Sequence, residues 1–319
     1  MGNQDNSPQI NDLIFKELIK RGYSLEGNTR VWNIADSKLW YLRPDQAQAF
    51  LDLESSKVYQ EEIIQKEINL ISKNIDEIFG RFGEEPLNVI DLGCGDGKKA
   101  VLFIEKFKGK RIRYCPVDIS SYMVNKAIDK ISRLSNVEEV VEFQWNISDF
   151  ENLENITFLL RQGEYSKNLI LLLGNTLGNF EINELLYEIR SSMKEGDFLL
   201  IGNGLNNEDQ ESILSSYRDP AQDNFLEKIP RQLGLDKDEV EYNVRFKNSR
   251  VEAFYTIKKD KVIEFQRKKV TFNKGDQIIV AVSYKYNESE FVSFLNLYFD
   301  EVTARVSDDK SYALALCKK

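Results

Sequence analysis

Histidine is absent from this sequence of 319 residues. Imidazole is the general base of the common hydrolase triads and a frequent ligand of catalytic zinc, so its absence excludes the serine, cysteine and zinc hydrolases that depend on it. Proton transfer would then fall to carboxylates, tyrosine, lysine or water. Any chemistry of this chain must work without an imidazole side chain.

Cysteine is scarce, and long apolar runs are missing. Cys94, Cys115 and Cys317 are widely spaced and odd in number, so they predict neither a disulfide framework nor a zinc knuckle. No run reaches the roughly 18 apolar residues of a membrane span, and the polar start MGNQDNSPQI lacks the apolar core of a signal peptide. We therefore expect a cytoplasmic protein with no membrane partner.

Positive charge is also in deficit. The chain has 43 Lys and Arg against 52 Asp and Glu, a formal net charge of -9. Nucleic-acid binding favours a basic stripe, and the nearest candidate, 267–269, reads as the solvated face of a strand. We expect no nucleic-acid partner, and we expect a monomer that acts on a small molecule.

Strands that alternate with helices fill the middle of the chain. Apolar residues recur every three to four positions from Glu62 to Phe79 and predict a helix. Strand-like runs separated by helical segments then follow at 87–92, 112–120, 140–150, 168–175 and 197–204. This alternation predicts an α/β fold with a mostly parallel, Rossmann-like sheet that binds ligands at the carboxyl ends of its strands.

The pattern changes after Gly204. Residues 209–235 look helical, and alternating segments at 251–259, 262–272 and 277–286 predict an antiparallel meander. A helix over 288–297 and an antiparallel hairpin over 299–319 then return to the first pattern. We expect one domain from 61–204 plus 286–319, and an inserted α+β domain from 1–60 plus 205–285.

The segment VIDLGCGDG ends the first of these strands in Gly93, Gly95 and Gly97. Glycine lets the backbone approach a ligand closely, and the next helix offers its N-terminal N–H groups. The G-x-G-x-G spacing differs from the dinucleotide fingerprint, and Asp118 ends the following strand. This arrangement resembles the Rossmann-like methyltransferases that use S-adenosylmethionine; the alternative is a glycine-rich turn with no ligand.

That resemblance implies a cofactor site with no metal. Gly93 and Gly95 would lie against S-adenosylmethionine, Asp118 would accept its two ribose hydroxyls, and Asp149 with Phe150 would frame its adenine. One domain, 61–204 plus 286–319, would hold this cofactor, and the other would bind the substrate.

A second motif, LLLGNTLGNF at 171–180, makes the resemblance more specific. Together with LGCGDGKKAVLFIEK, RYCPVDIS, SDF and GDFLLIGNGL, it is similar in order and spacing to the histidine Nα-methyltransferases of ergothioneine biosynthesis and to the dimethylallyltryptophan N-methyltransferases, over most of the chain. The resemblance implies that Gly174 passes beneath the cofactor and that the carboxamide of Asn179 holds the substrate amine. A plain turn role for Asn179 is the alternative.

The same resemblance assigns further contacts, residue by residue. Lys99 would lie near the methionyl carboxylate of the cofactor, and Tyr41 would cover the cofactor, with a core role for Tyr41 as the alternative. Tyr59 would face the substrate amine as a candidate proton acceptor, although the Pro-Thr-Arg that usually follows is missing. Tyr217 would contact the substrate carboxylate, and Ser283 would face the substrate.

Two positions depart from the histidine-specific members. Ala281 stands where those members have a glutamate for the imidazole, and Ala253 stands where they have a bulky residue. A buried imidazole N–H without a partner costs about 1 to 3 kcal/mol. We therefore expect a substrate other than histidine, with a larger or more apolar side chain; ordinary strand packing of two alanines is the alternative.

These patterns predict an N-methyltransferase that acts on the α-amine of a small amino acid or amino-acid derivative and releases S-adenosylhomocysteine. Methyl transfer requires positioning and desolvation of the amine more than acid-base help, which is compatible with a chain without histidine. The alternatives are a homologue that binds the cofactor but has lost turnover, and a methyltransferase for protein or RNA.

Overall fold

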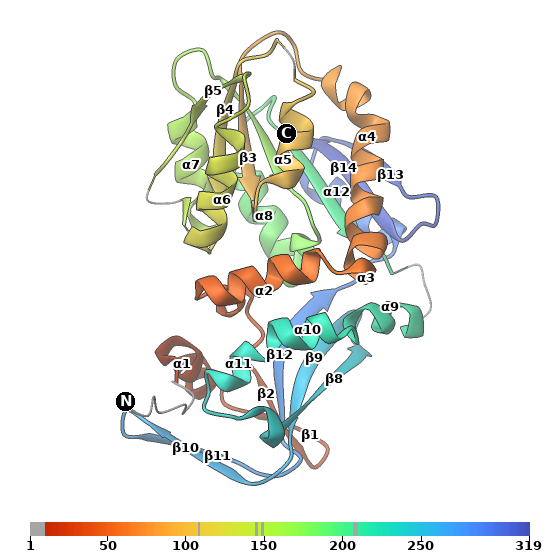
Figure 1. Cartoon of the computed structure of the whole chain (residues 1–319). Helices are drawn as coiled ribbons and strands as arrows, with labels where there is room; N and C mark the ends of the chain where they lie inside the picture. Colours follow the sequence, from red (N-terminus) through yellow and green to blue (C-terminus); the bar gives the residue numbers. More distant parts are fainter. Residues whose placement is uncertain (1–9, 108, 144–145, 148–149, 207–209) are drawn as a thin grey trace. The chain divides into compact units, whose positions relative to one another are not determined.

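The computed structural model describes residues 10–107, 109–143, 146–147, 150–206 and 210–319 (Figure 1). The chain divides into two compact units: unit 1 is Met1–Leu53 with Gln210–Ser283, and unit 2 is Glu54–Asp209 with Tyr284–Lys319. These bounds lie within a few residues of the expected domains. The assignment of one unit to cofactor and the other to substrate remains a prediction.

Unit 2 is built on a seven-stranded sheet in the order β13-β14-β7-β6-β3-β4-β5. The five strands at the β5 side run parallel, and the last two form an antiparallel hairpin paired to β7. The predicted mostly parallel sheet with a closing hairpin is therefore confirmed. The strands are β3 (Leu87–Leu92), β4 (Ile112–Val117), β5 (Val137–Val140), β6 (Lys167–Leu172), β7 (Phe198–Gly204), β13 (Glu301–Val306) and β14 (Tyr312–Lys318).

Helices cover both faces of this sheet (Figure 1). Strand β3 is buried along its whole length, as expected for a central parallel strand, and its residues alternate between the two layers: Val89 packs into one and Ile90 into the other. One layer contains α4 (Gln65–Phe79), α5 (Lys98–Ile104) and α6 (Ser121–Ile131); the other contains α7 (Leu153–Leu160), α8 (Ile182–Ser192) and α12 (Glu288–Tyr298).

The strand expected at 140–150 is wrong in its extent. Strand β5 ends at Val140, Ile147 makes a single parallel bridge to Asp118, and Phe150 begins the 3₁₀ turn η4 (Phe150–Asn152). The side chain of buried Asn146 donates to the carbonyls of Pro116 and Val141, so it takes over partners that a regular ladder would use. A side chain that competes with the backbone ladder explains the early end of the strand.

The helix expected from Glu62 also begins differently. The short α3 (Lys57–Tyr59) runs into a π-helical turn, η2 (Gln60–Ile64), and regular α-helix starts only at Gln65. Among the described residues of unit 2, the 3₁₀ turn η5 (Thr176–Asn179) and the connecting loops remain.

Unit 1 contains a five-stranded mixed sheet in the order β1-β2-β12-β9-β8. Strand β12 pairs parallel to β2, whereas β8 and β9 pair antiparallel. Its strands are β1 (Ser24–Glu26), β2 (Thr29–Asn33), β8 (Val240–Lys247), β9 (Arg250–Ile257) and β12 (Gln277–Tyr284). Its helices include α1 (Asp12–Arg21), α2 (Pro44–Glu54), α9 (Gln210–Tyr217), α10 (Pro220–Leu226) and α11 (Lys228–Arg231), with the 3₁₀ turns η1 (Ser37–Trp40) and η6 (Lys237–Glu239).

The expected antiparallel meander is wrong. Its middle segment folds on itself into a separate hairpin of β10 (Lys261–Phe265) and β11 (Lys268–Phe272), turning at Gln266 and Arg267. Both turn residues have positive φ, 49° and 63°. Glycine and asparagine normally mark such a turn, and this pair contains neither, so the sequence gives no signal for it.

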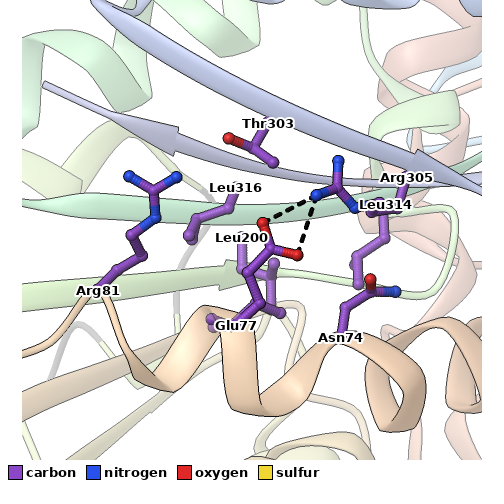
Figure 2. A pocket seen from close by; sticks show the side chains of 9 residues that line it. Asn74, Glu77, Arg81, Leu200, Thr303, Arg305, Leu314 and Leu316 are labelled. Carbon is purple, nitrogen blue, oxygen red and sulfur yellow. Dashed lines mark hydrogen bonds and ion pairs between the residues drawn. The ribbon is translucent and has the colours of Figure 1, made fainter.

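Figure 2 shows a pocket in unit 2 between α4 and the strands β7, β13 and β14. Glu77 and Arg305 form an ion pair across it, with distances of 2.8 and 2.9 Å between Arg305 Nη2 and the two carboxylate oxygens. Asn74, Ile78, Arg81, Thr303 and leucine side chains of the sheet complete the lining. None of the predicted site residues lines this pocket, and none of the helices in the described residues has the length and apolar character to cross a membrane.

Candidate active site

The loop after β3 takes its shape from glycine. Gly93, Gly95 and Gly97 have φ of 67°, 51° and 75°, a region that other residues adopt only with strain. A Cβ on Gly97 would also lie 3.0 Å from the Cα of Ala127, whereas a Cβ on Gly95 would enter open space. The loop is thus packed at one end and leaves open space beside Gly95.

Asp118 lies beside this loop, directly after β4. Its Oδ2 accepts from the Gly95 N–H at 3.1 Å, and its Oδ1 accepts from the Ser120 N–H at 2.9 Å. Burial raises the pKa of Asp118 to about 6, and the backbone hydrogen bonds oppose that rise. An ionised carboxylate has about four acceptor positions, so it can accept two further donors such as neighbouring hydroxyls.

The loop after β6 contacts the loop after β3. Gly174 has a φ of 76°, and a Cβ there would overlap with the ammonium of Lys99. A Cβ on Gly93 would in turn lie 3.2 Å from Oγ1 of Thr176. The structure therefore places Gly93 against Thr176 and Gly174 against Lys99, and the predicted contacts of these residues with a cofactor stay predictions.

The two Gly-Asn pairs of this second loop have different environments. Asn175 has a φ of 63°, and its Oδ1 accepts from the N–H of Gly204 at the end of β7. Asn179 ends η5 and is half-buried; across the described part of the chain, no hydrogen bond or ion pair involves its side chain. Asn175 thus shapes the loop, and the Asn179 carboxamide remains available to a ligand.

An aromatic pair flanks the same loop. Phe150 and Phe180 have ring centroids 5.1 Å apart, which joins the segment after β5 to the residue that follows Asn179. Asp149, the other residue expected at the adenine, lies outside the described residues. The sequence interpretation missed Phe180, although its position directly after Asn179 was a usable signal.

Lys99 lies at the loop as expected but already has an acidic partner. Its Nζ is 2.9 Å from Oε2 of Glu67, whose side chain is 0% exposed. Burial alone would lower the pKa of Lys99, but the charges of Glu67 and Glu54 outweigh it and raise that pKa. The sequence interpretation missed Glu67. The usable signal was a charged residue on the apolar face of the helix, three positions after Ile64 and four before Ile71.

Tyr59 ends α3, just before the π-helical turn. The pKa of Tyr312 is raised well above its usual value, first by burial, then by Glu67, and also by the nearby Tyr59. Tyr59 therefore lies near the group of Tyr312 and Glu67. Its contact with a substrate amine stays a prediction.

The other predicted residues belong to unit 1. Tyr41 packs in an aromatic cluster, 5.4 Å from the ring of Phe50 and 5.8 Å from that of Phe225, so part of its surface has a core role. Tyr217 ends α9, and its carbonyl accepts from Oη of Tyr242 at 2.9 Å. The lid and carboxylate roles of these two tyrosines stay predictions.

The three remaining positions lie on neighbouring strands of the unit 1 sheet. Ala253 is on β9 and is 3% exposed. Ala281 and Ser283 are two apart on β12, which places their side chains on one face. Glu252, beside Ala253, is buried and paired with Arg245 and Arg250, so its charge is balanced without a ligand.

In chemical terms, unit 2 presents three groups around the two joined loops: a carboxylate with spare acceptor positions, an ammonium, and an unengaged carboxamide. Together with the open space beside Gly95, they suit a ligand with hydroxyls, a carboxylate and an amine close by. Among the described residues no group of three or more acidic or cysteine side chains could hold a metal ion.

Comparison with known proteins decides between the possible ligands. The sequence matches the family model of histidine-specific, SAM-dependent methyltransferases over residues 56–319. The chain belongs to this family. As a member of it, the chain is an S-adenosylmethionine-dependent methyltransferase.

Individual relatives are distant. Ergothioneine biosynthesis protein 1 of Schizosaccharomyces pombe is 26% identical over 165 residues, which are 50% of this chain and 21% of the length of that relative. A SAM-dependent methyltransferase from Clostridium acetobutylicum shares 14% identity with a TM-score of 0.44, over 85% of this chain and 98% of that one. Magnesium protoporphyrin IX methyltransferase of Synechocystis, solved with SAH, shares 12% with a TM-score of 0.43, over 85% and 93%.

The arrangement in unit 2 fits this cofactor. The half-buried Asp118 carboxylate suits ribose hydroxyls, and the Lys99 ammonium suits the methionyl carboxylate. The open space beside Gly95 would let the backbone approach the ligand. These residue roles remain proposals.

Binding of S-adenosylhomocysteine should weaken as pH falls. A protonated Asp118 has lost acceptor capacity, and with a pKa of about 6 the group is mostly protonated at pH 5 and mostly ionised at pH 7. We expect affinity to be about tenfold lower at pH 5 than at pH 7, because binding requires the ionised form of Asp118. Calorimetry of the wild type and of Asp118→Asn checks this. A pH dependence of equal size in the variant would assign it to another group.

Asn175 should matter for stability. Asn175→Ala loses the acceptor for the Gly204 N–H and places alanine at positive φ, so we expect a loss of about 2 kcal/mol in the free energy of unfolding. Asn175→Gly relieves the strain and should lose only about half of that. Urea denaturation of the two variants measures the difference, and equal losses would contradict the role of the left-handed backbone.

Proposed function

We propose that this protein transfers methyl groups from S-adenosylmethionine to the α-amine of a small amino acid, or of an amino-acid derivative, other than histidine. The observation that carries the proposal is the Asn179 side chain. It lies at the end of the loop after β6, which contacts the glycine-rich loop after β3, here called the glycine loop. The side chain has no partner among the described residues. The S. pombe relative named for ergothioneine biosynthesis supports a small-molecule substrate.

Asn179 suits an amine because its carboxamide oxygen accepts an N–H without competing as a base. Accepting one N–H fixes the rotation of the amine and so the direction of its lone pair. When bound, S-adenosylmethionine supplies an electrophilic methyl group on a good leaving group, so the protein contributes mainly alignment and exclusion of water. The amine must be neutral to react, and we assign its proton to Tyr59 or to a water molecule.

The remaining roles divide between the two units. Unit 2 holds the cofactor through Gly95, Asp118 and Lys99, with Gly93 and Gly174 giving the loops their close approach. The substrate is bound by unit 1, where Tyr217 and Ser283 are the proposed contacts for its carboxylate and amine end. The chain is proposed to act as a monomer.

The choice of substrate rests on two small side chains. The family model describes its members as histidine-specific, whereas this chain has Ala253 and Ala281 at the two positions where the resemblance assigns pocket side chains. A pocket that lacks a partner for an imidazole N–H discriminates against histidine. We propose a larger or more apolar side chain on the accepted amino acid.

A second candidate is a homologue that binds the cofactor without turnover. The segment after Tyr59 favours it, because Pro-Thr-Arg is replaced by a chain that forms the π-helical turn η2. The availability of the Asn179 side chain favours the enzyme. An assay of S-adenosylhomocysteine release over a panel of amino acids and their derivatives separates the two: release with none of them, together with tight cofactor binding, would favour the second candidate.

Asn179→Ala should impair turnover without affecting the cofactor. We expect kcat to fall about a hundredfold or more, as for loss of a group that orients the reacting atom. Affinity for S-adenosylhomocysteine and the melting temperature should stay close to wild type, because no described residue depends on this side chain. A variant that turns over at the wild-type rate would show that the assignment is wrong.

Ala281→Glu should move the specificity toward histidine. A carboxylate would supply the missing partner for an imidazole N–H, worth about tenfold or more in kcat/KM. Ala281→Leu, similar in bulk but unable to accept, is the matched control and should show no such gain. Measuring kcat/KM for histidine relative to the best accepted substrate checks it; an equal change in both variants would assign the effect to bulk and contradict the role of the carboxylate, and no change in either would place position 281 outside the pocket.

A further inference from the structure

The buried carboxylate of Glu67 has no part in the mechanism above, yet three separate elements converge on it. Oε1 accepts from the N–H of Gly174 at 2.8 Å and from Oη of Tyr312 at 2.6 Å. Oε2 lies 2.9 Å from Nζ of Lys99. One side chain of α4 thus binds the end of β6, the start of β14 and the first turn of α5.

The two nearest glycines have no room for a side chain because of this group. A Cβ on Gly174 would overlap with the Lys99 ammonium. A Cβ on Gly202 of β7 would lie 2.6 Å from Oε1 of Glu67 and 2.7 Å from Oη of Tyr312. Glycine at both positions leaves the space that the ion pair occupies. The sequence therefore accommodates this buried pair at two separate positions.

The charges explain why Glu67 can be buried at this place. A fully buried carboxylate is unfavourable unless it is paired and hydrogen-bonded, and Glu67 has one ammonium and two donors. The Lys99 side chain is 19% exposed, so part of its surface still faces outward. The pair therefore holds an ammonium at the edge of the glycine loop with few alternative rotamers.

The position of the pair links it to the proposed chemistry. Gly174 begins the short segment that ends at Asn179, and its N–H lies just past the last residue of β6 that pairs with β3, Leu172. An N–H at this place has no strand partner, so the Glu67 carboxylate takes that role. The two oxygens of one carboxylate thus hold both parts: Oε1 binds the start of the segment that ends at Asn179, and Oε2 holds the Lys99 ammonium.

We propose that Glu67 is a positioning residue for the cofactor site, acting through Lys99 and Gly174 and not by touching the reactants. The role rests on the proposed function, because it requires that Lys99 receive the methionyl carboxylate of S-adenosylmethionine. Tyr312 supports it by fixing the orientation of the Glu67 carboxylate.

The test compares S-adenosylhomocysteine binding by wild type and Glu67→Gln in the full chain, by calorimetry at pH 7 and pH 9.5. We expect the variant to bind about tenfold more weakly at pH 7, because an amide cannot balance the Lys99 charge. The deficit should grow at pH 9.5, because in the variant only Glu54 and Asp91 oppose the effect of burial, which lowers the pKa of Lys99, so the ammonium is lost more readily with rising pH than in the wild type, where that pKa is raised.

Asp197→Asn is the matched control. Asp197 is also buried, 1% exposed, is paired with Arg161 and accepts from the N–H groups of Asn168 and Lys194 at 2.9 and 2.8 Å. It precedes β7, at the amino end of that strand. The control should lower the melting temperature as Glu67→Gln does, but leave the affinity for S-adenosylhomocysteine and its pH dependence at the wild-type values.

Each outcome decides the proposal. Wild-type affinity and pH dependence in Glu67→Gln would overturn it and leave Glu67 as a residue of the fold alone. A wild type that binds no S-adenosylhomocysteine would overturn the proposed function together with it. Should Glu67→Gln fail to fold, Tyr312→Phe replaces it: this variant keeps the ring, removes one of the two donors to Oε1 of Glu67, and should weaken binding by about threefold, the effect of losing one hydrogen bond. Unchanged binding in that variant would count against the proposal.

Discussion

The register between two parallel strands is the constraint on which the site depends. Strand β3 pairs with β6 so that Leu92 lies opposite Leu172, and both strands therefore end at the same level of the sheet. The two loops that follow emerge side by side, and each needs glycine where it meets the other: Gly93 against Thr176, and Gly174 against the ammonium of Lys99. A slip of one residue would turn every side chain of a strand to the opposite layer and separate these contacts.

Much of unit 2 could be predicted because its signals are local. Buried parallel strands read as apolar runs, and β3 was placed at 87–92 from such a run. The failures occurred where tertiary contacts replaced local patterns. Asn146 removes the backbone partners that would have lengthened β5, and the hairpin of β10 and β11 turns at Gln266 without a turn residue. The parallel pairing of β12 with β2 joins segments far apart in sequence, which no local pattern reports.

The site shows the same division. The glycine loops could be located from the motif, but their contacts, Gly93 against Thr176 and Gly174 against Lys99, appear only in the fold. The local pattern treats Asn175 and Asn179 alike, because both follow glycine, and only the family resemblance assigned the amine to Asn179. The fold adds that Asn175 binds the neighbouring strand end, whereas the side chain of Asn179 has no hydrogen-bond partner among the described residues. Glu67 was missed for a related reason: an isolated acidic residue on an apolar helix face has no meaning until its partners from α5, β6 and β14 are known.

The crowding around Gly202 has a consequence for how this sequence can diverge. A side chain at Gly202 would need the small volume that the hydroxyl of Tyr312 and the carboxylate of Glu67 already occupy. A change at any one of these three positions would be tolerated only with compensating changes at the others. Relatives should therefore differ at these three positions together. A relative with alanine at the position of Gly202 should also lack the glutamate that corresponds to Glu67.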